Sequence, residues 1–326
     1  MFIGIVVGLG SAAYGLGVYS LIAQALVNSF IATVMIWFYS SWRPEFNFSL
    51  TEIKRIWKYT ANLSIFEFIN YFAKNADNFL IGKYLSASAL GVYSLAYKIM
   101  LYPLQNISRI LMNVLFPAFA TLQNDNARFK KAYLRVIFFI SLVSFPLMIG
   151  LIATADVLVD VLFGDKWKGL AILLIILAPS GMMRSIFTTV GSIYMAKGHT
   201  DMQLKLGTVN AIFTVAGFIV GLNWGVNGVA ISYLIVNLGM LYPIFYISWK
   251  QIELSVTDGL AEITPVFVIS VLMGMVVYLT DLFLLSGIDN KIFRLGLMIT
   301  IGTVFYMAML HIRYGSIKSL ISQLRT

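Results

Sequence analysis

The chain has 326 residues, of which 60% are apolar and 11% are charged, and its formal net charge is +9. Because soluble domains carry about 25% charged residues, this composition excludes an ordinary soluble enzyme, a disordered chain and a fibrous protein. Together with a mean hydropathy of +0.86, it indicates an all-α protein that crosses a membrane several times.

The apolar segments predict a transmembrane bundle of about ten helices. Two stretches, 1–42 and 206–249, contain no charged residue, and each is long enough for two spans of about 20 residues. We expect these stretches to turn within the glycine-containing segments 8–17 and 223–228. In chain order, the expected helices cover 1–13, 17–40, 59–82, 91–117, 136–158, 170–195, 206–222, 228–248, 263–284 and 295–312.

The first of these helices is short for a transmembrane span. Thirteen helical residues reach about 20 Å, whereas the hydrocarbon core of a bilayer is about 30 Å thick. We therefore expect the chain to begin inside a helix, with upstream sequence missing.

The basic residues predict a topology. The loops 41–58, 118–135, 196–205 and 249–262 and the tail 313–326 hold 14 Lys and Arg residues, whereas the opposite loops hold 5. By the positive-inside rule, the first set faces the cytoplasm, and so does the C-terminus. This explanation of the excess positive charge leaves no reason to expect nucleic-acid binding.

Polar side chains recur along one face of the expected helix 59–82. They are Glu67, Asn70, Lys74, Asp77 and Asn78, at the spacing of a single helical stripe. Charges at membrane depth usually face the protein interior or a wet cavity. Two structural alternatives remain open for Lys74, Asp77 and Lys98. One is a set of ion pairs, such as Lys74 with Asp77 three residues later. The other is that charged side chains near the ends of spans extend towards the membrane surface.

Three more basic residues lie within expected spans. Lys98 and Arg109 share a face of the helix 91–117 with Gln105, and Arg184 lies deep in the helix 170–195, one turn before Thr188. With Lys74, Glu67 and Asp77, they predict a cavity of net positive charge. Such a cavity suits an anionic head group, because guanidinium and ammonium groups bind phosphate oxygens.

No catalytic, metal or cofactor motif stands out. The chain has no cysteine and two histidines, which we expect near the cytoplasmic membrane surface. A glycine-rich dinucleotide loop, a P-loop and an HExxH motif are all missing. We therefore expect no enzyme activity, no cofactor and no metal site.

Several motifs between residues 75 and 167 resemble a known family. They are NADNFLIGKYLSASALGVYSLAYKI (75–99), PLQNISRILMNVLFPAFATLQND (103–125) and FGDKW (163–167). Together they resemble the polysaccharide flippases, the Wzx-type O-antigen and exopolysaccharide exporters of the multidrug/oligosaccharidyl-lipid/polysaccharide superfamily.

The resemblance implies two six-helix lobes around a central cavity, as in multidrug exporters of the superfamily, followed by two extra helices. It implies that 1–58 holds the last helix pair of a first lobe and a cytoplasmic linker. It further implies that 59–250 is a complete second lobe, that 251–326 holds the extra helices and tail, and that the first four helices are absent.

The resemblance also implies a function. The substrate would be an undecaprenyl-pyrophosphate-linked oligosaccharide, turned across the bacterial inner membrane for lipopolysaccharide or exopolysaccharide synthesis. Partners would include the polysaccharide polymerase and the chain-length machinery. Arg184, Lys98, Arg109 and Lys74 would bind the pyrophosphate, and Glu67 and Asp77 would be the ion or proton sites. The alternatives are a cation-coupled multidrug exporter and a truncated membrane protein that does not transport.

Overall fold

The computed structural model describes residues 2–17, 19–43 and 48–315, and it also leaves the side chains of Phe2, 107–118, 120, 165 and 168 undescribed. Over the described ranges the chain forms ten α-helices and no strand. It divides into two compact units, Met1–Arg55 and Ile56–Thr326. The prediction of an all-α transmembrane bundle is confirmed.

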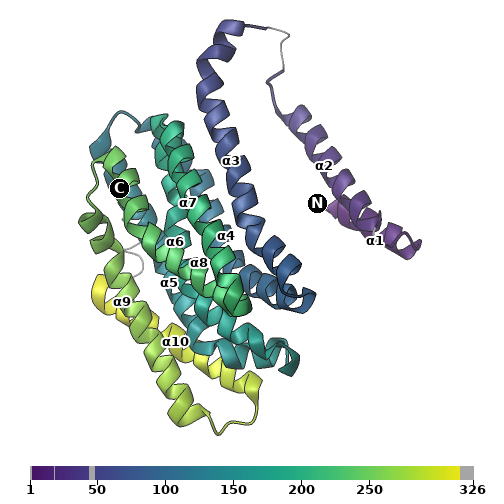
Figure 1. Ribbon diagram of the computed structural model, residues 1–326, viewed down its shortest axis with the longest axis vertical. Helices are drawn as coiled ribbons and strands as arrows, with labels where there is room; N and C mark the ends of the chain where they lie inside the picture. Colours follow the sequence, from purple (N-terminus) through teal and green to yellow (C-terminus); the bar gives the residue numbers. More distant parts are fainter. Residues whose placement is uncertain (1, 18, 44–47, 316–326) are drawn as a thin grey trace. The chain divides into compact units, whose positions relative to one another are not determined.

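The first unit contains a helical hairpin. Helix α1 (Phe2–Ala13) and helix α2 (Tyr19–Tyr39) pack together, as Figure 1 shows for the purple part of the ribbon. Gly4 and Gly8 face Asn28 and Gln24 of α2, and a Cβ atom at either glycine would meet these side chains at less than 3 Å. The small residues therefore let the two helices approach closely.

The second unit contains the remaining helices. They are α3 (Leu50–Tyr84, beginning in the first unit), α4 (Ala87–Thr121), α5 (Asn126–Leu162), α6 (Lys168–Lys197), α7 (Thr200–Gly221), α8 (Gly225–Trp249), α9 (Val256–Thr280) and α10 (Lys291–Tyr314). Side-chain caps fix several helix starts. Asp125, Ser255 and Asn290 each accept a hydrogen bond from the backbone N–H three residues ahead. Three short helical segments follow the ends of α5, α7 and α8, and a π-helical segment, Asp281–Leu285, follows α9.

The ten helices expected from the sequence correspond one to one to these ten, but several are longer than expected. Helices α3 and α5 contain 35 and 37 residues, which corresponds to about 53 and 55 Å of helix. They are therefore longer than the hydrocarbon core is thick. Apolar composition detects only the part within the membrane, so residues 50–58 of the predicted loop 41–58 and most of the predicted loop 118–135 are helical.

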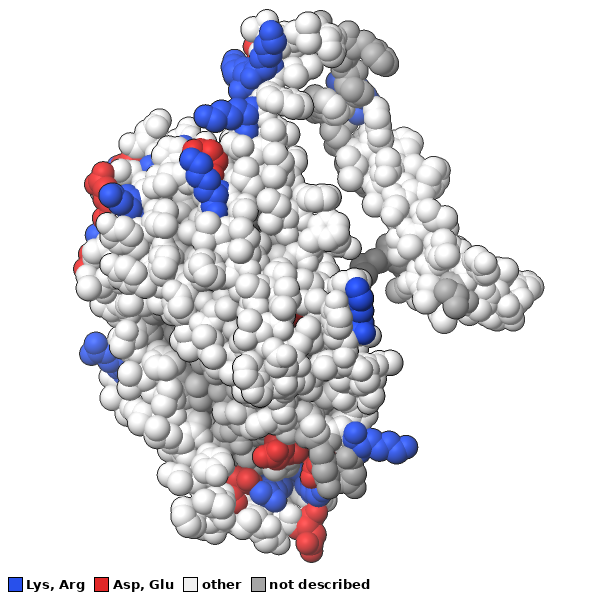
Figure 2. Space-filling model, in the orientation of Figure 1, with Lys and Arg blue, Asp and Glu red and all other residues white. Residues whose placement is uncertain are grey.

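Six helical segments of the described chain are long and apolar enough to cross a membrane, and one of them, Thr200–Ile252, includes both α7 and α8. On the face drawn in Figure 2, most charged side chains gather towards two ends of the molecule and leave a largely uncharged surface between them. The chain is a multi-pass membrane protein.

The tight hairpin between α7 and α8 forms where the sequence predicted it. Gly225 has φ +69°, a left-handed conformation that favours glycine. Gly221 and Gly228 bring the two helices into backbone contact, since a Cβ atom at Gly221 would lie 2.6 Å from the carbonyl oxygen of Gly228. Side chains at these glycines would separate the helices.

Helix α6 is held rigidly because it packs against α4, α5 and α8. Buried hydroxyl groups join it to its neighbours. Ser185 shares a hydrogen bond of 2.9 Å with Ser144 of α5, and Thr189 shares one of 2.8 Å with Tyr133, which accepts another from the indole of Trp249. These bonds fix the rotation of α6, and Arg184 is next to the first of them.

Helices α9 and α10 pack against α5. The ring of Phe145 meets that of Phe267 edge-on, and the hydroxyl of Tyr306 donates to the carbonyl of Leu142 at 2.7 Å. The predicted division at residues 58 and 250 remains a prediction.

Candidate functional site

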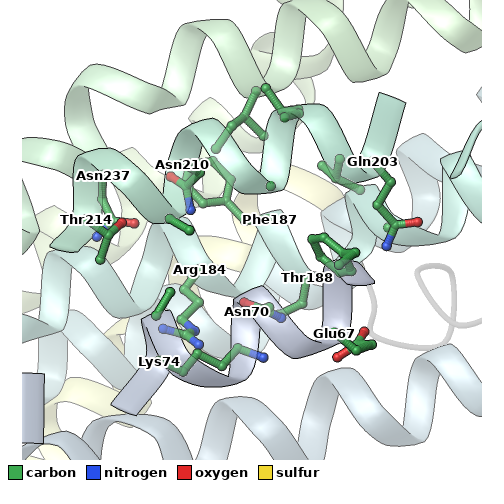
Figure 3. Close-up of a pocket in the computed structure, with 18 of the residues that line it drawn as sticks. Glu67, Asn70, Lys74, Arg184, Phe187, Thr188, Gln203, Asn210, Thr214 and Asn237 are labelled. Atoms are coloured by element: carbon green, nitrogen blue, oxygen red, sulfur yellow. The ribbon is translucent and has the colours of Figure 1, made fainter. Parts of the chain in front are cut away.

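A cavity of about 350 Å³ lies within the second unit. It is lined by α3, α4, α6, α7 and α8, and Figure 3 shows its side chains. Its charged and amide-bearing lining residues are Glu67, Asn70, Lys74, Asp77, Arg184, Gln203, Asn210 and Asn237. A cavity of this size holds a small ligand or one part of a larger one.

Arg184 is held in one orientation by two tyrosines. Its Nη1 donates hydrogen bonds of 2.6 Å to the hydroxyls of Tyr97 on α4 and Tyr233 on α8. The guanidinium carbon also lies 5.9 Å from the centre of the Tyr97 ring, within the range of a cation–π contact. We call this arrangement the tyrosine clamp. Nε and Nη2 of Arg184 make no hydrogen bond within the described structure, which leaves them available to a ligand.

Lys74 lies beside Arg184 in Figure 3. Both side chains carry a positive charge, and like charges repel each other. Among the residues with described side chains, Lys74 has neither a hydrogen bond nor an ion pair, so the pair of Lys74 with Asp77 left open above does not form. Two neighbouring cations that repel each other favour an anion between them.

Asp77 is almost completely buried, with 1% of its surface exposed. Its Oδ2 accepts a hydrogen bond of 2.9 Å from the hydroxyl of Tyr93, and its Oδ1 accepts one of 2.7 Å from the backbone N–H of Asn78. The Tyr93 ring stacks on that of Tyr97. The carboxyl group is therefore connected, through the two stacked rings, to the tyrosine clamp.

The structure places most of the predicted stripe on α3 in the wall of the cavity. Glu67, Asn70, Lys74 and Asp77 line the cavity. Asn78 does not, and its buried Oδ1 has no hydrogen-bond partner among the described residues. Thr188 of α6 also lines the cavity, one turn after Arg184.

The residues of α4 that were predicted to face the cavity are not found in its described lining. The side chains of Lys98 and Gln105 are exposed and do not line the cavity. The side chain of Arg109 lies outside the described residues. The described lining therefore contains two basic and two acidic residues, and the predicted excess of positive charge is not found in it.

Sequence reasoning missed the contribution of α7 and α8. Gln203, Asn210 and Thr214 line the cavity from α7, at intervals of seven and four residues, and Asn237 lines it from α8. Their helical spacing was visible in the sequence. They were missed because the cavity was predicted from charged residues and not from neutral amides, and because α7 was expected to begin at residue 206. In the part of the chain that the structure describes, no cluster of His, Asp or Glu could hold a metal ion.

Comparison with known proteins identifies the family. Residues 1–172 match the model of a family described as "Polysaccharide biosynthesis protein". The chain belongs to this family. The resemblance to polysaccharide exporters seen in the sequence is thereby confirmed.

Relatives support this assignment. The chain is 28% identical to the lipopolysaccharide biosynthesis protein WzxC of Escherichia coli, over 77% of this chain and 53% of the relative. It is also 28% identical to the teichuronic acid biosynthesis protein TuaB of Bacillus subtilis, over 91% of this chain and 62% of the relative. With the succinoglycan biosynthesis transport protein ExoT of Rhizobium meliloti the identity is 25%, over 94% of this chain and 63% of the relative. The chain thus spans about half to three-fifths of these relatives.

Solved structures show the same fold. The lipid II flippase MurJ in an inward closed conformation aligns with a TM-score of 0.70 and 20% identity, over 98% of this chain and 66% of that one. A multidrug resistance transporter of the MATE family, in an outward-facing conformation, aligns with a TM-score of 0.53 and 14% identity. This alignment covers 82% of this chain and 66% of the transporter. The expected likeness to this transporter class is confirmed at the level of the fold.

Proposed function

We propose that this chain acts in a flippase that moves an undecaprenyl-pyrophosphate-linked oligosaccharide across the bacterial inner membrane. The observation that carries the proposal is the pair of cations in the cavity. Arg184 is oriented by the tyrosine clamp, and Lys74 lies beside it. A guanidinium with two nitrogens available, next to an ammonium group, matches the oxygens of a pyrophosphate.

The family and the relatives support this choice of substrate, because the family is described as a polysaccharide biosynthesis protein and the relatives act in lipopolysaccharide and teichuronic acid biosynthesis. The glycan would pass through the polar cavity while the lipid stays in the bilayer. Glu67 and Asp77, the acidic residues of the described lining, would be the sites for a coupling ion or proton. A polymerase and chain-length machinery would act on the exported product.

The proposed topology follows the distribution of basic residues. The link between α4 and α5, the link between α6 and α7 and the C-terminal tail would face the cytoplasm. The segment between α9 and α10 would then face the opposite side. The cavity would extend from Gln203, near the cytoplasmic end of α7, past Glu67 in the middle of α3, to Arg184 at greater depth.

The test measures binding of farnesyl pyrophosphate and of uncharged farnesol to the purified chain in lipid nanodiscs. We expect Arg184→Met to weaken binding of the pyrophosphate at least tenfold, because hydrogen bonds to charged groups contribute about 1.5–3 kcal/mol, and to leave farnesol binding unchanged. Arg184→Lys keeps the charge but loses the planar fork, so its affinity should be intermediate.

Arg313→Met is the matched control, since Arg313 is exposed near the end of α10 and does not line the cavity. Equal loss of both ligands in Arg184→Met would indicate a structural effect and contradict the proposal. Binding of a cationic dye that depends on Glu67 and Asp77, without pyrophosphate binding, would favour the multidrug exporter instead.

A further inference from the structure

The cavity has a second region that differs in chemistry from the cation pair. Figure 3 shows Gln203 and Glu67 towards the end of the cavity away from Lys74 and Arg184. Gly191 of α6 lines the cavity beside Gln203. Since Gly191 follows Arg184 by two helical turns, this region lies about 10 Å along α6 from the cations.

Gln203 is the decisive residue of this region. Only 6% of its surface is exposed, yet its Oε1 has no hydrogen-bond partner in the described structure. A buried polar atom without a partner destabilises a protein, and most such atoms in native structures are paired. Gln203 lines the cavity, so a ligand towards which its carboxamide turns, and which donates a hydrogen bond, would give this oxygen its missing partner.

Two glycines border this region. A Cβ atom at Gly191 would lie 3.4 Å from Nε2 of Gln203, so any larger side chain there would crowd the amide group. The ring of Phe66 lies directly against Gly207 of α7, where a Cβ atom would approach the ring to 2.3 Å. The region thus presents an amide next to an aromatic ring.

Further amides extend the region towards the cations. Asn210 lies two turns after Gln203 on α7, and Asn70 lies on the opposing α3. Neither side chain makes a hydrogen bond with another described residue. Uncharged groups that both donate and accept hydrogen bonds match hydroxyl groups, whereas they offer no charge to bind a phosphate.

We propose that Gln203, supported by Asn210 and Asn70, forms a subsite that hydrogen-bonds the hydroxyl groups of the carbohydrate part of the ligand. The ring of Phe66 would contact the apolar face of a sugar. The inference rests on the proposed function, since the cation pair holds the pyrophosphate and sets the position of the attached sugar. The subsite makes the cavity selective for a glycosylated lipid over the bare lipid pyrophosphate.

The test compares two pyrophosphate diesters of the same charge, a farnesyl methyl pyrophosphate (the bare probe) and farnesyl N-acetylglucosaminyl pyrophosphate (the glycosylated probe). Each is titrated into the purified chain in nanodiscs. We expect the wild-type chain to bind the glycosylated probe more tightly. Gln203→Leu keeps the approximate size but removes the amide, and it should weaken binding of the glycosylated probe about five- to tenfold while leaving the bare probe unchanged.

Gln123→Leu is the matched control, because Gln123 is an exposed glutamine in the link after α4. Thermal unfolding without ligand provides a second readout. Because Gln203→Leu removes an unpaired buried polar atom, it should not lower the melting temperature, and it should raise it slightly. A lowered melting temperature would indicate that Gln203 has a structural role and would overturn the inference.

The outcomes separate the subsite from the function on which it rests. If Gln203→Leu weakens both probes equally, or neither, the subsite is wrong and the pyrophosphate site stands. If Arg184→Met leaves both probes bound normally, the proposed function fails, whatever Gln203 does. If the wild-type chain binds both probes equally, the cavity does not recognise the sugar and the subsite is also wrong.

Discussion

The tyrosine clamp makes a quantitative prediction about ligand binding. Tyr97 and Tyr233 are buried, with 9% and 5% of their surfaces exposed, and both hydroxyls bond the same nitrogen of Arg184. Without them, the arginine side chain gains rotamers that a ligand must suppress on binding. Ordering one flexible side chain costs about 0.5–1.5 kcal/mol.

The double substitution Tyr97→Phe and Tyr233→Phe removes both hydroxyls and keeps both rings. Because the guanidinium is only partly buried, water can replace the lost bonds and maintain its solvation. The expected effect is therefore the ordering cost alone. At about 1.4 kcal/mol for each factor of ten, affinity for farnesyl pyrophosphate should fall up to about tenfold, and each single substitution should account for part of this loss.

The assay is isothermal titration, arranged as a double-mutant cycle with Arg184→Met. In the Arg184→Met background, removal of the tyrosine hydroxyls should have no further effect on affinity, because the group they orient is gone. Tyr306→Phe is the matched control. It removes a hydroxyl of similar burial that bonds the Leu142 carbonyl between α10 and α5, and it should leave affinity unchanged.

Two results would refute the reasoning. The first is wild-type affinity in the doubly substituted chain, which would show that Arg184 is oriented without the clamp. The second is an equal loss of affinity in the presence and absence of Arg184, which would show that the tyrosines act on the ligand directly or on the shape of the cavity.

Two further predictions concern stability and topology. Asp281 and Arg294 form two hydrogen bonds of 2.6 and 2.8 Å that join the π-helical segment to α10, so Asp281→Asn should destabilise the chain by about 1–2 kcal/mol. Exchanging the two charges should restore part of the melting temperature, and no restoration would contradict a role for the pair. Because the chain has no cysteine, single cysteines report topology cleanly. A membrane-impermeant maleimide should label Asp289→Cys in intact spheroplasts but label Lys131→Cys only after permeabilisation, and the reverse pattern would invert the proposed topology.

The sequence alone determined the number and type of the helices, because length, apolar composition and charge-free stretches are local properties. It also located the cavity face of α3. Glu67, Asn70, Lys74 and Asp77 repeat at the period of one helix, and polar groups within an apolar helix are stable only where they avoid lipid. The same argument pointed to Arg184, which also lines the cavity.

Helix ends were harder to predict from composition. Gln203 was assigned to a loop because the apolar stretch begins at residue 206, yet α7 begins at Thr200. A helix can continue beyond the hydrocarbon region, since its backbone hydrogen bonds form equally well there. For this reason, Gln203 was not predicted to lie in the cavity wall.

Only the tertiary structure decided which side chains meet. On α4, Tyr93, Tyr97 and Met100 are buried, and this choice of face leaves Lys98, which lies about 100° further around the helix, exposed. Likewise, nothing local in the sequence connects Tyr97 and Tyr233 to Arg184. The rotation of each helix about its axis is set by the sum of many apolar contacts with its neighbours, and those contacts exist only once the bundle has assembled.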